Sequence, residues 1–238
     1  MVVSVEEPGT ATVTLRTVGE ALARARRLLG SPGRHVLGIA GAPGSGKSTL
    51  AASVAAQLGE EAIVVPMDGF HLTDEELERL GSRDRKGAQD TFDVAGYVSL
   101  LRRLHEETDH TVYAPEFDRV RESSVAGAIA VRPEHRLVVT EGNYLLLDVP
   151  PWREIRELLD DAWFVELDDE TRVERLIRRH VVHGKEQTEA TEWVLRSDEA
   201  NARLIAPTVD RADAVLRIGG PASRPSQHDP EHDLEEDG

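Results

Sequence analysis

The sequence predicts an α/β fold in which a mostly parallel sheet carries helices on both faces. Short apolar runs of strand length alternate with segments of helical periodicity along most of the chain. Strands joined through helices in this way form parallel sheets that are buried on both sides. The chain has 238 residues, 39% of them hydrophobic, which suits one large domain with a substantial core.

The expected elements follow in chain order. Residues 17–29 place Val18, Leu22, Ala25 and Leu29 at helical spacing, and the glycines and proline of 30–33 end that helix. An apolar run at 35–40 predicts the first strand, and a glycine-rich loop and an alanine-rich helix to about Leu58 follow it. Further strands are expected at 62–65, 111–114, 137–140, 162–167 and 212–218, with an extended segment at 124–131. Further helices are expected at 73–80, 93–107, 152–159, 171–182 and 189–205.

The ends of the chain differ from its middle in composition. We interpret residues 1–15 as a flexible N-terminus and 16–218 as the folded domain. The stretch from Ser226 to Gly238 holds six acidic residues and no lysine or arginine. A run this polar buries too little apolar surface to fold, so residues 219–238 are predicted to form a disordered acidic tail.

Composition also narrows the class of protein. The net charge of −16 argues against nucleic-acid binding, because phosphate backbones require a basic face. The absence of cysteine excludes disulfides, thiolate metal sites and thiol nucleophiles. No apolar run approaches the roughly 20 residues of a membrane span, and the N-terminus lacks a signal-peptide pattern, so we expect a cytoplasmic protein without membrane contact. The sequence leaves a homodimer open.

A phosphate-binding motif lies between the first expected strand and its helix. It matches G-x-x-x-x-G-K-[ST] and consists of Gly41, Ala42, Pro43, Gly44, Ser45, Gly46, Lys47 and Ser48, with Thr49 next. The glycines let main-chain N–H groups turn toward phosphate oxygens, and the helix adds the positive end of its dipole. We expect Lys47 to neutralise the β- and γ-phosphates and Ser48 to bind Mg²⁺.

This motif predicts the three-layer sandwich of P-loop NTPases and a bound nucleoside triphosphate with Mg²⁺. A chance match in a glycine-rich turn is the alternative, and the strand before the motif and the helix after it count against that alternative. The sequence has no clear Asn-Lys-x-Asp motif for reading guanine, which favours ATP.

Two carboxylates follow expected strands. In an open parallel sheet ligands bind beyond the carboxyl ends of the strands, so Asp68 and Glu141 should lie near the phosphate loop. Asp68 could accept the proton of an attacking hydroxyl, or cap a turn, or order a water on Mg²⁺. Glu141 could help to bind Mg²⁺ or orient the acceptor, or cap its strand. Phe70 and His71 are candidates for the acceptor pocket, although a structural hydrogen bond explains His71 nearly as well.

Two basic segments are further candidates. Residues 83–87 form a short basic loop on an acidic protein, which suits an anionic substrate or the donor phosphates; a solvated loop is the alternative. Residues 170–186 are expected to form a helical lid, because Arg172, Arg175 and Arg179 share one helix face. We expect Arg175 and Arg179 to reach the phosphates, with His180 as a weaker candidate and Gly184 as a hinge. A solvated amphipathic helix is the alternative.

Taken in order, the motifs resemble the phosphoribulokinase/uridine kinase/pantothenate kinase superfamily of P-loop kinases. Within it they resemble the nucleoside/nucleotide kinase-like branch, also described as fructose-transport-system kinase-like. The resemblance covers about residues 16–218. It is carried by Gly41–Ser48, Met67-Asp68-Gly69-Phe70-His71, Arg85-Lys86-Gly87, Thr91-Phe92-Asp93, Pro115-Glu116-Phe117-Asp118-Arg119 and Glu141-Gly142-Asn143-Tyr144-Leu145-Leu146.

The resemblance implies that Asp68 is the general base and Glu141 an active-site acid. It also implies that the acceptor pocket is bordered by Arg85, Lys86, Tyr113, Phe117, Asp118 and Arg119. Asp198 and Asn201 match the pattern of the group as well, although ordinary helix-surface residues explain them almost as well, and Asp118 with Arg119 could be a plain surface pair. True uridine kinases carry Asp-Ser-Phe-Tyr where this chain has Asp-Gly-Phe-His, and pantothenate kinases are longer.

The expected function is an ATP-dependent kinase that phosphorylates a hydroxyl of a small metabolite, such as a nucleoside, a sugar or a pantothenate-like alcohol. The alternative is a regulatory P-loop NTPase that hydrolyses ATP in response to a protein partner. A nucleic-acid end kinase is disfavoured by the overall acidity.

Overall fold

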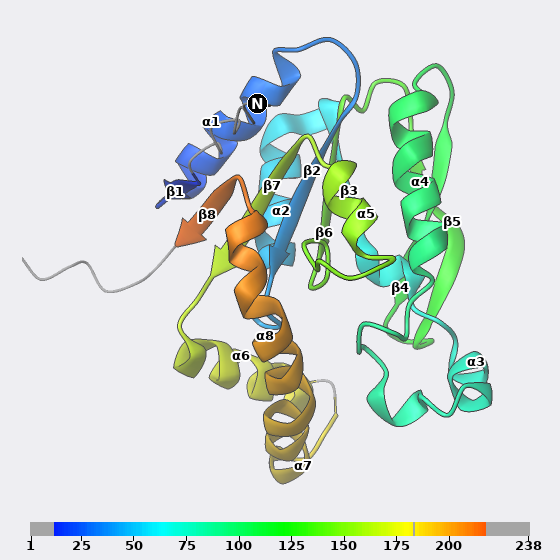
Figure 1. Ribbon diagram of the computed structural model, residues 1–238, viewed down its shortest axis with the longest axis vertical. Helices are drawn as coiled ribbons and strands as arrows, with labels where there is room; N and C mark the ends of the chain where they lie inside the picture. The colour runs from blue at the N-terminus through cyan, green and yellow to red at the C-terminus, as the bar shows by residue number, and fades with distance from the viewer. Residues whose placement is uncertain (1–11, 183, 218–238) are drawn as a thin grey trace, which may run out of the picture.

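The computed structural model describes residues 12–182 and 184–217 (Figure 1). Six strands form one sheet in the order β1-β8-β7-β2-β6-β3, and every neighbouring pair is parallel. This confirms the α/β fold expected from the sequence. The strands are β1 (Val13–Leu15), β2 (His35–Gly41), β3 (Ala62–Pro66), β6 (Leu137–Gly142), β7 (Asp161–Glu166) and β8 (Ala214–Arg217).

Within residues 12–182 and 184–217, eight α-helices join or extend these strands. They are α1 (Val18–Leu29), α2 (Lys47–Leu58), α3 (Asp74–Arg79), α4 (Val94–Glu106), α5 (Arg153–Glu157), α6 (Asp169–Val182), α7 (Gln187–Trp193) and α8 (Glu199–Ile205). The single helix expected over 189–205 is interrupted by a π-helical segment, Val194–Asp198. Such segments are rare in proteins, and those that do occur often lie at functional sites.

Two hydrophobic cores lie on opposite faces of the sheet, because successive strand residues point to opposite sides. In β2, Val36 and Ala40 pack into a core shared with α4 and α5, whereas Leu37 and Ile39 pack into a core shared with α1 and α2. Figure 1 shows the two helix layers on either side of the sheet. This is the three-layer arrangement that the sequence predicts.

A β-hairpin lies outside this sheet. Strands β4 (Val112–Asp118) and β5 (Ser123–Val131) pair with each other in an antiparallel manner and form a separate two-stranded sheet. The sequence analysis predicted a strand at 111–114 and an extended segment at 124–131, but not this pairing. The inner ends of the hairpin are tied to the domain because Val112, Ala114 and Val131 are fully buried in the core that contains α4.

One expected boundary is wrong. Residues 1–15 were expected to be flexible, but Val13–Leu15 form β1 and pair with β8 at the edge of the sheet. Residues 1–11 and the expected acidic tail, 219–238, lie outside the described residues. Within the described part of the chain, no helix is long and apolar enough to cross a membrane.

Candidate active site

A cavity of about 530 Å³ opens at the carboxyl ends of β2, β3 and β6. In Figure 1 the strands β2 and β7 point toward this end of the sheet, where α6, α7 and α3 also lie. The cavity brings together most of the residues singled out in the sequence: Pro43, Lys47, Ser48, Asp68, His71, Lys86, Phe117, Arg119, Glu141, Arg179, His180, Asp198 and Asn201.

The phosphate loop joins β2 to α2 through a backbone that only glycine adopts easily. Gly44 and Gly46 have positive φ angles of 80° and 95°. A Cβ atom on Gly44 would lie 2.8 Å from Leu176 Cγ and 3.0 Å from the Arg172 carbonyl oxygen, so this glycine also lets α6 pack directly on the loop. The loop and the start of the expected lid therefore form one packed unit.

Two features of the loop fit a bound triphosphate. Gly46 occupies the N-cap of α2, and no described side chain caps the helix, so its first N–H groups remain available to an anion. The Ser45 hydroxyl is buried and has no hydrogen-bond partner among the described residues. Phosphate oxygens would satisfy such donors. The Ser48 hydroxyl lies beside the Glu141 carboxylate, and oxygen ligands of this kind suit Mg²⁺.

Lys47 shares this end of the cavity with the two carboxylates. Burial lowers the pKa of Lys47, while the charges of Glu141 and Asp68 act in the opposite direction. Burial raises the pKa of Glu141, and Lys47 and the Ser48 hydroxyl partly offset that effect. Each partner stabilises the charged form of the other, so the ammonium and the carboxylate form one electrostatic unit.

Glycines also allow Asp68 and Glu141 to lie at the same end of the sheet, near the carboxyl ends of the neighbouring strands β3 and β6. Pro66 of β3 is the parallel partner of Glu141 in β6, and Asp68 follows in a 3₁₀ turn, Met67–Phe70. A Cβ atom on Gly142 would lie 2.5 Å from Met67 Cβ, and one on Gly69 would lie 2.3 Å from the Pro115 carbonyl oxygen. The turn that carries Asp68 therefore fits between β6 and the hairpin only because both positions lack a side chain.

The acceptor side of the cavity begins at His71. Its Nδ1 donates a hydrogen bond to the Asp68 carbonyl oxygen at 2.9 Å, and its ring lies 4.1 Å from the Phe92 ring and 4.8 Å from the Phe117 ring, centroid to centroid. Burial lowers the pKa of His71. A neutral imidazole that donates through Nδ1 leaves Nε2 as an acceptor. Arg119, next to the hairpin tip, places Nη2 3.6 Å from Asp68 Oδ2.

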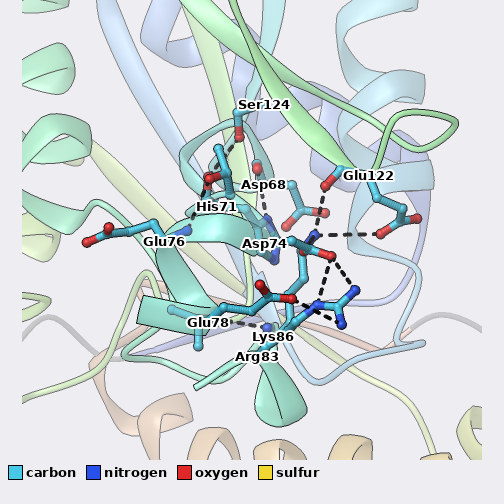
Figure 2. A network of polar contacts seen from close by, with 12 residues as sticks. Asp68, His71, Asp74, Glu76, Glu78, Arg83, Lys86, Glu122 and Ser124 are labelled. Atoms are coloured by element: carbon cyan, nitrogen blue, oxygen red, sulfur yellow. Dashed lines mark hydrogen bonds and ion pairs between the residues drawn. The ribbon is translucent and has the colours of Figure 1, made fainter. Parts of the chain in front are cut away.

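The basic loop of residues 83–87 closes the far side of the cavity. The Lys86 ammonium lies 2.6 Å from Asp74 Oδ1 and donates to the Glu122 carbonyl oxygen at 2.7 Å (Figure 2). It also lies 5.4 Å from the centroid of the Phe117 ring. Lys86 thereby connects the start of α3 to the tip of the β4–β5 hairpin.

Four residues named for the acceptor pocket are absent from the described cavity lining: Phe70, Arg85, Tyr113 and Asp118. Phe70 packs against Tyr97, with ring centroids 4.9 Å apart. Arg85 is exposed and pairs with Asp90 and the Ser82 hydroxyl. The Asp118 carboxylate accepts the main-chain N–H groups of Val120 and Arg121 at the hairpin tip.

An irregularity in the β4–β5 pairing separates Tyr113 from Phe117. Strand alternation without interruption would place these two side chains on one face. The register shifts between Ala114 and Glu116, however, where residues 126–128 of β5 lie opposite the single residue Pro115 of β4, so the regular alternation is broken there. Phe117 lines the cavity, whereas Tyr113 is 60% exposed on the outside of the hairpin.

The three arginines of the expected lid face lie in different environments. Arg172 is 1% exposed and pairs with Asp169 and Glu199, which makes it a structural residue of the α6–α8 contact. Arg175 reaches the phosphate loop, with Nη1 3.9 Å from the position of a Cβ atom on Gly46. Arg179 lines the cavity. Two of the three therefore lie at the phosphate loop or in the lining of the cavity.

The cavity also contains residues that the sequence analysis did not nominate. Asn143 lines it, and its Oδ1 is buried with no hydrogen-bond partner in the described chain. Trp193 and Ser197 come from the region of the π-helical segment, and His180 Nε2 lies 3.2 Å from Asp198 Oδ2 across α6 and that segment. Asp74 and Glu122 are ordinary acids in the sequence, without a motif to mark them. Asn143 is the one of these residues that the sequence could have indicated, because it follows Glu141 by two residues.

The sheet and the phosphate loop define a P-loop protein of the kinase class. Residues 36–222 match the model of the phosphoribulokinase/uridine kinase family, and the chain belongs to this family. It is accordingly a P-loop kinase, a phosphotransferase with a nucleotide-binding loop.

Individual relatives agree with this assignment. A Schizosaccharomyces pombe protein named "Putative uridine kinase C227.14" is 37% identical over 205 residues, which cover 82% of this chain and 87% of that protein. The uncharacterized protein YggC of Escherichia coli K12 is 33% identical over 190 residues, 78% of each chain. A crystal structure titled as a "putative fructose transport system kinase" from Silicibacter sp. TM1040 is 39% identical, with a TM-score of 0.77, and covers 84% of this chain and 98% of its own.

Proposed function

We propose that this protein is an ATP-dependent kinase that transfers the γ-phosphoryl group to a hydroxyl of a small metabolite. The observation that carries the proposal is the shared cavity of Lys47, Ser48 and Asp68. A phosphate cradle and a carboxylate that line one cavity can hold a donor and an acceptor at the same time, which is what direct transfer requires.

In this proposal, different side chains bind the nucleotide and accept the proton. The phosphate loop and Lys47 hold the triphosphate, and Asp68 accepts the proton of the attacking hydroxyl. Arg175 and Arg179 stabilise the charge of the transferred group. Ser48 and Glu141 would hold Mg²⁺, which supplies positive charge at the β- and γ-phosphate oxygens when it is bound. Arg119 and the hydrogen bond from His71 position Asp68 and its turn.

The extent of the cavity favours a metabolite over water as the acceptor. From Asp68 it continues past His71 and Phe117 to Lys86 and the hairpin tip. A regulatory NTPase needs room only for one water beside the phosphates. The two functions are separated by measuring ADP release with and without a panel of nucleosides, sugars and pantothenate-like alcohols. Full-rate ADP release without any acceptor, unchanged by every member of the panel, would show that the kinase proposal is wrong.

The role of Asp68 is tested with Asp68→Asn. Loss of the general base should lower kcat by about 10²–10⁴-fold, because proton transfer by a positioned side chain contributes that much. Affinity for a non-hydrolysable ATP analogue should stay close to that of the wild type, since the phosphate loop is unchanged. Asp210→Asn, an exposed acid outside the cavity lining, is the matched control. Turnover that survives in Asp68→Asn would remove Asp68 from the base role.

A further inference from the structure

We infer that the acceptor is an uncharged hydroxyl compound, and that the site discriminates against phosphorylated or carboxylated acceptors. The inference rests on the proposed kinase function and goes beyond it by naming the charge class of the substrate. It reverses the expectation raised by the basic loop in the sequence.

The first observation is that each cation of this loop already has an acidic partner, and Figure 2 shows the partners of Lys86 and Arg83. Lys86 lies 2.6 Å from Asp74. Arg83 lies 3.1 Å from Asp74 and 3.4 Å from Glu78. Arg85 pairs with Asp90 outside the cavity. A basic patch in the sequence is therefore a set of ion pairs in the folded chain.

The second observation is that the Lys86 pair is part of the wall. The ammonium side chain is only 16% exposed and joins Asp74, at the start of α3, to the Glu122 carbonyl oxygen at the hairpin tip. An anionic acceptor that recruited Lys86 would have to break this connection and leave Asp74 with the more exposed Arg83 as its remaining counter-charge. Taking the better-buried counter-charge away from a partly buried carboxylate is costly.

The third observation is the balance of charge on the acceptor side. Asp68, Asp74 and Glu122 line it together with Arg83, Lys86 and Arg119, so three acids lie among three bases, and Lys185 with Asp198 adds one charge of each sign to the cavity lining. Arg119 lies beside Asp68, at the reacting end of the cavity. An added carboxylate or phosphate would therefore meet as much negative as positive charge.

The remaining lining suits a neutral molecule. His71, Phe92 and Phe117 form an apolar wall of stacked rings. Because His71 Nδ1 donates to the Asp68 carbonyl oxygen, its Nε2 is left to accept a hydrogen bond, and a hydroxyl is a donor that a carboxylate cannot replace. The geometry thus offers apolar contact and hydroxyl recognition.

The first experiment compares neutral acceptors with anionic counterparts in which a hydroxyl carries a phosphate or a hydroxymethyl group is replaced by a carboxylate: ribose with ribose 5-phosphate, glycerol with glycerate, and pantothenol with pantothenate. In any pair that is turned over, the neutral member should have a kcat/KM at least about tenfold higher, the usual worth of one hydrogen bond to a charged group. An anionic member that is the better substrate would overturn the inference and leave the kinase function intact. ADP release that no compound stimulates would count against the kinase function instead.

The second experiment removes the acidic partner of Lys86. Asp74→Asn removes the carboxylate that holds Lys86 and Arg83, so the preference for the neutral member should shrink by about tenfold or reverse. Asp84→Asn is the control. It removes one negative charge from the basic loop itself, and the ion pairs above do not involve Asp84. Equal preferences in the two variants would contradict the role given to Asp74.

A third experiment does not depend on turnover. With the phosphate loop filled by Mg²⁺ and a non-hydrolysable ATP analogue, sulfate serves as the anion probe and the melting temperature is the readout. Sulfate should stabilise Asp74→Asn more than wild type and Asp84→Asn, and Lys86→Met in the Asp74→Asn background should remove the gain. Saturable stabilisation of the wild type that Lys86→Met abolishes, or no gain in Asp74→Asn, would overturn the inference.

Discussion

The two ends of the cavity are built from different parts of the polypeptide. The proposed donor end is centred on one continuous loop, in which glycines at 44 and 46 set the backbone shape and no described side chain caps the helix that follows. The acceptor end is assembled from side chains of four separate segments: the turn after β3, the start of α3, the loop of 83–87 and the β4–β5 hairpin.

This difference explains how one loop can serve many substrates. Main-chain donors do not change when side chains change, so the donor end recognises phosphate in any sequence that keeps the loop shape. Side-chain pairs such as Lys86 with Asp74 can be rearranged by single substitutions. We therefore expect specificity to be set at the proposed acceptor end.

Among the tests of this contrast between the two ends, the largest effect is expected from Lys47, which lines the donor end. Lys47→Ala should lower kcat/KM for ATP by about 10²–10³-fold, since it removes a cation that stabilises charge in the transition state. It should weaken triphosphate binding as well as turnover. Acceptor binding, measured by calorimetry without nucleotide, should change little if the two ends are independent. A comparable loss of acceptor affinity would break the contrast between them.

An intermediate effect is expected at Gly69, where the acceptor end meets the hairpin. A Cβ atom there would lie 2.3 Å from the Pro115 carbonyl oxygen, so Gly69→Ala must displace backbone. We expect a loss of about 1–3 kcal/mol in the free energy of unfolding, as for other overpacked sites, and a raised acceptor KM with nucleotide affinity retained. Urea unfolding and steady-state kinetics measure both. Gly19→Ala in α1, where the nearest atom is 3.8 Å away, should be neutral or stabilising.

The smallest effect concerns pH and His71. Because burial lowers the pKa of His71, below about pH 6.5 the unfolded chain binds a proton that the folded chain does not, and stability falls as the pH falls. His71→Gln should make that fall shallower, by at most about 1.4 kcal/mol per pH unit, the value for one proton. Urea unfolding between pH 7 and 5.5 measures the slope.

His110→Gln provides a control of opposite sign. The Asp109 carboxylate raises the pKa of His110, so its contribution to stability is present at low pH and is lost as the pH rises. Its removal should make the fall toward low pH steeper. Equal slopes in His71→Gln and wild type would place His71 in a more hydrated acceptor end than the one described.

Most of the fold and the donor end could be predicted from the sequence, because local patterns determine them. The apolar run of β2 and the glycine spacing of residues 41–48 are readable without tertiary information. The acceptor end depends on non-local facts. The irregularity in the β4–β5 pairing separates Tyr113 from Phe117, and Asp74 and Glu122 meet Lys86 only after α3 and the hairpin have been placed. Nothing in the residues near these acids marks them.

The contact between Gly44 and α6 has a consequence for closure. Because Leu176 and the main chain at Arg172 press on the phosphate loop, the first two turns of α6 cannot swing without pulling the cradle apart. Movement is then left to the turns after Leu176, where Arg179 and His180 lie. We therefore expect the arginines to reach the nucleotide by a bend within the helix rather than by rotation of a rigid flap.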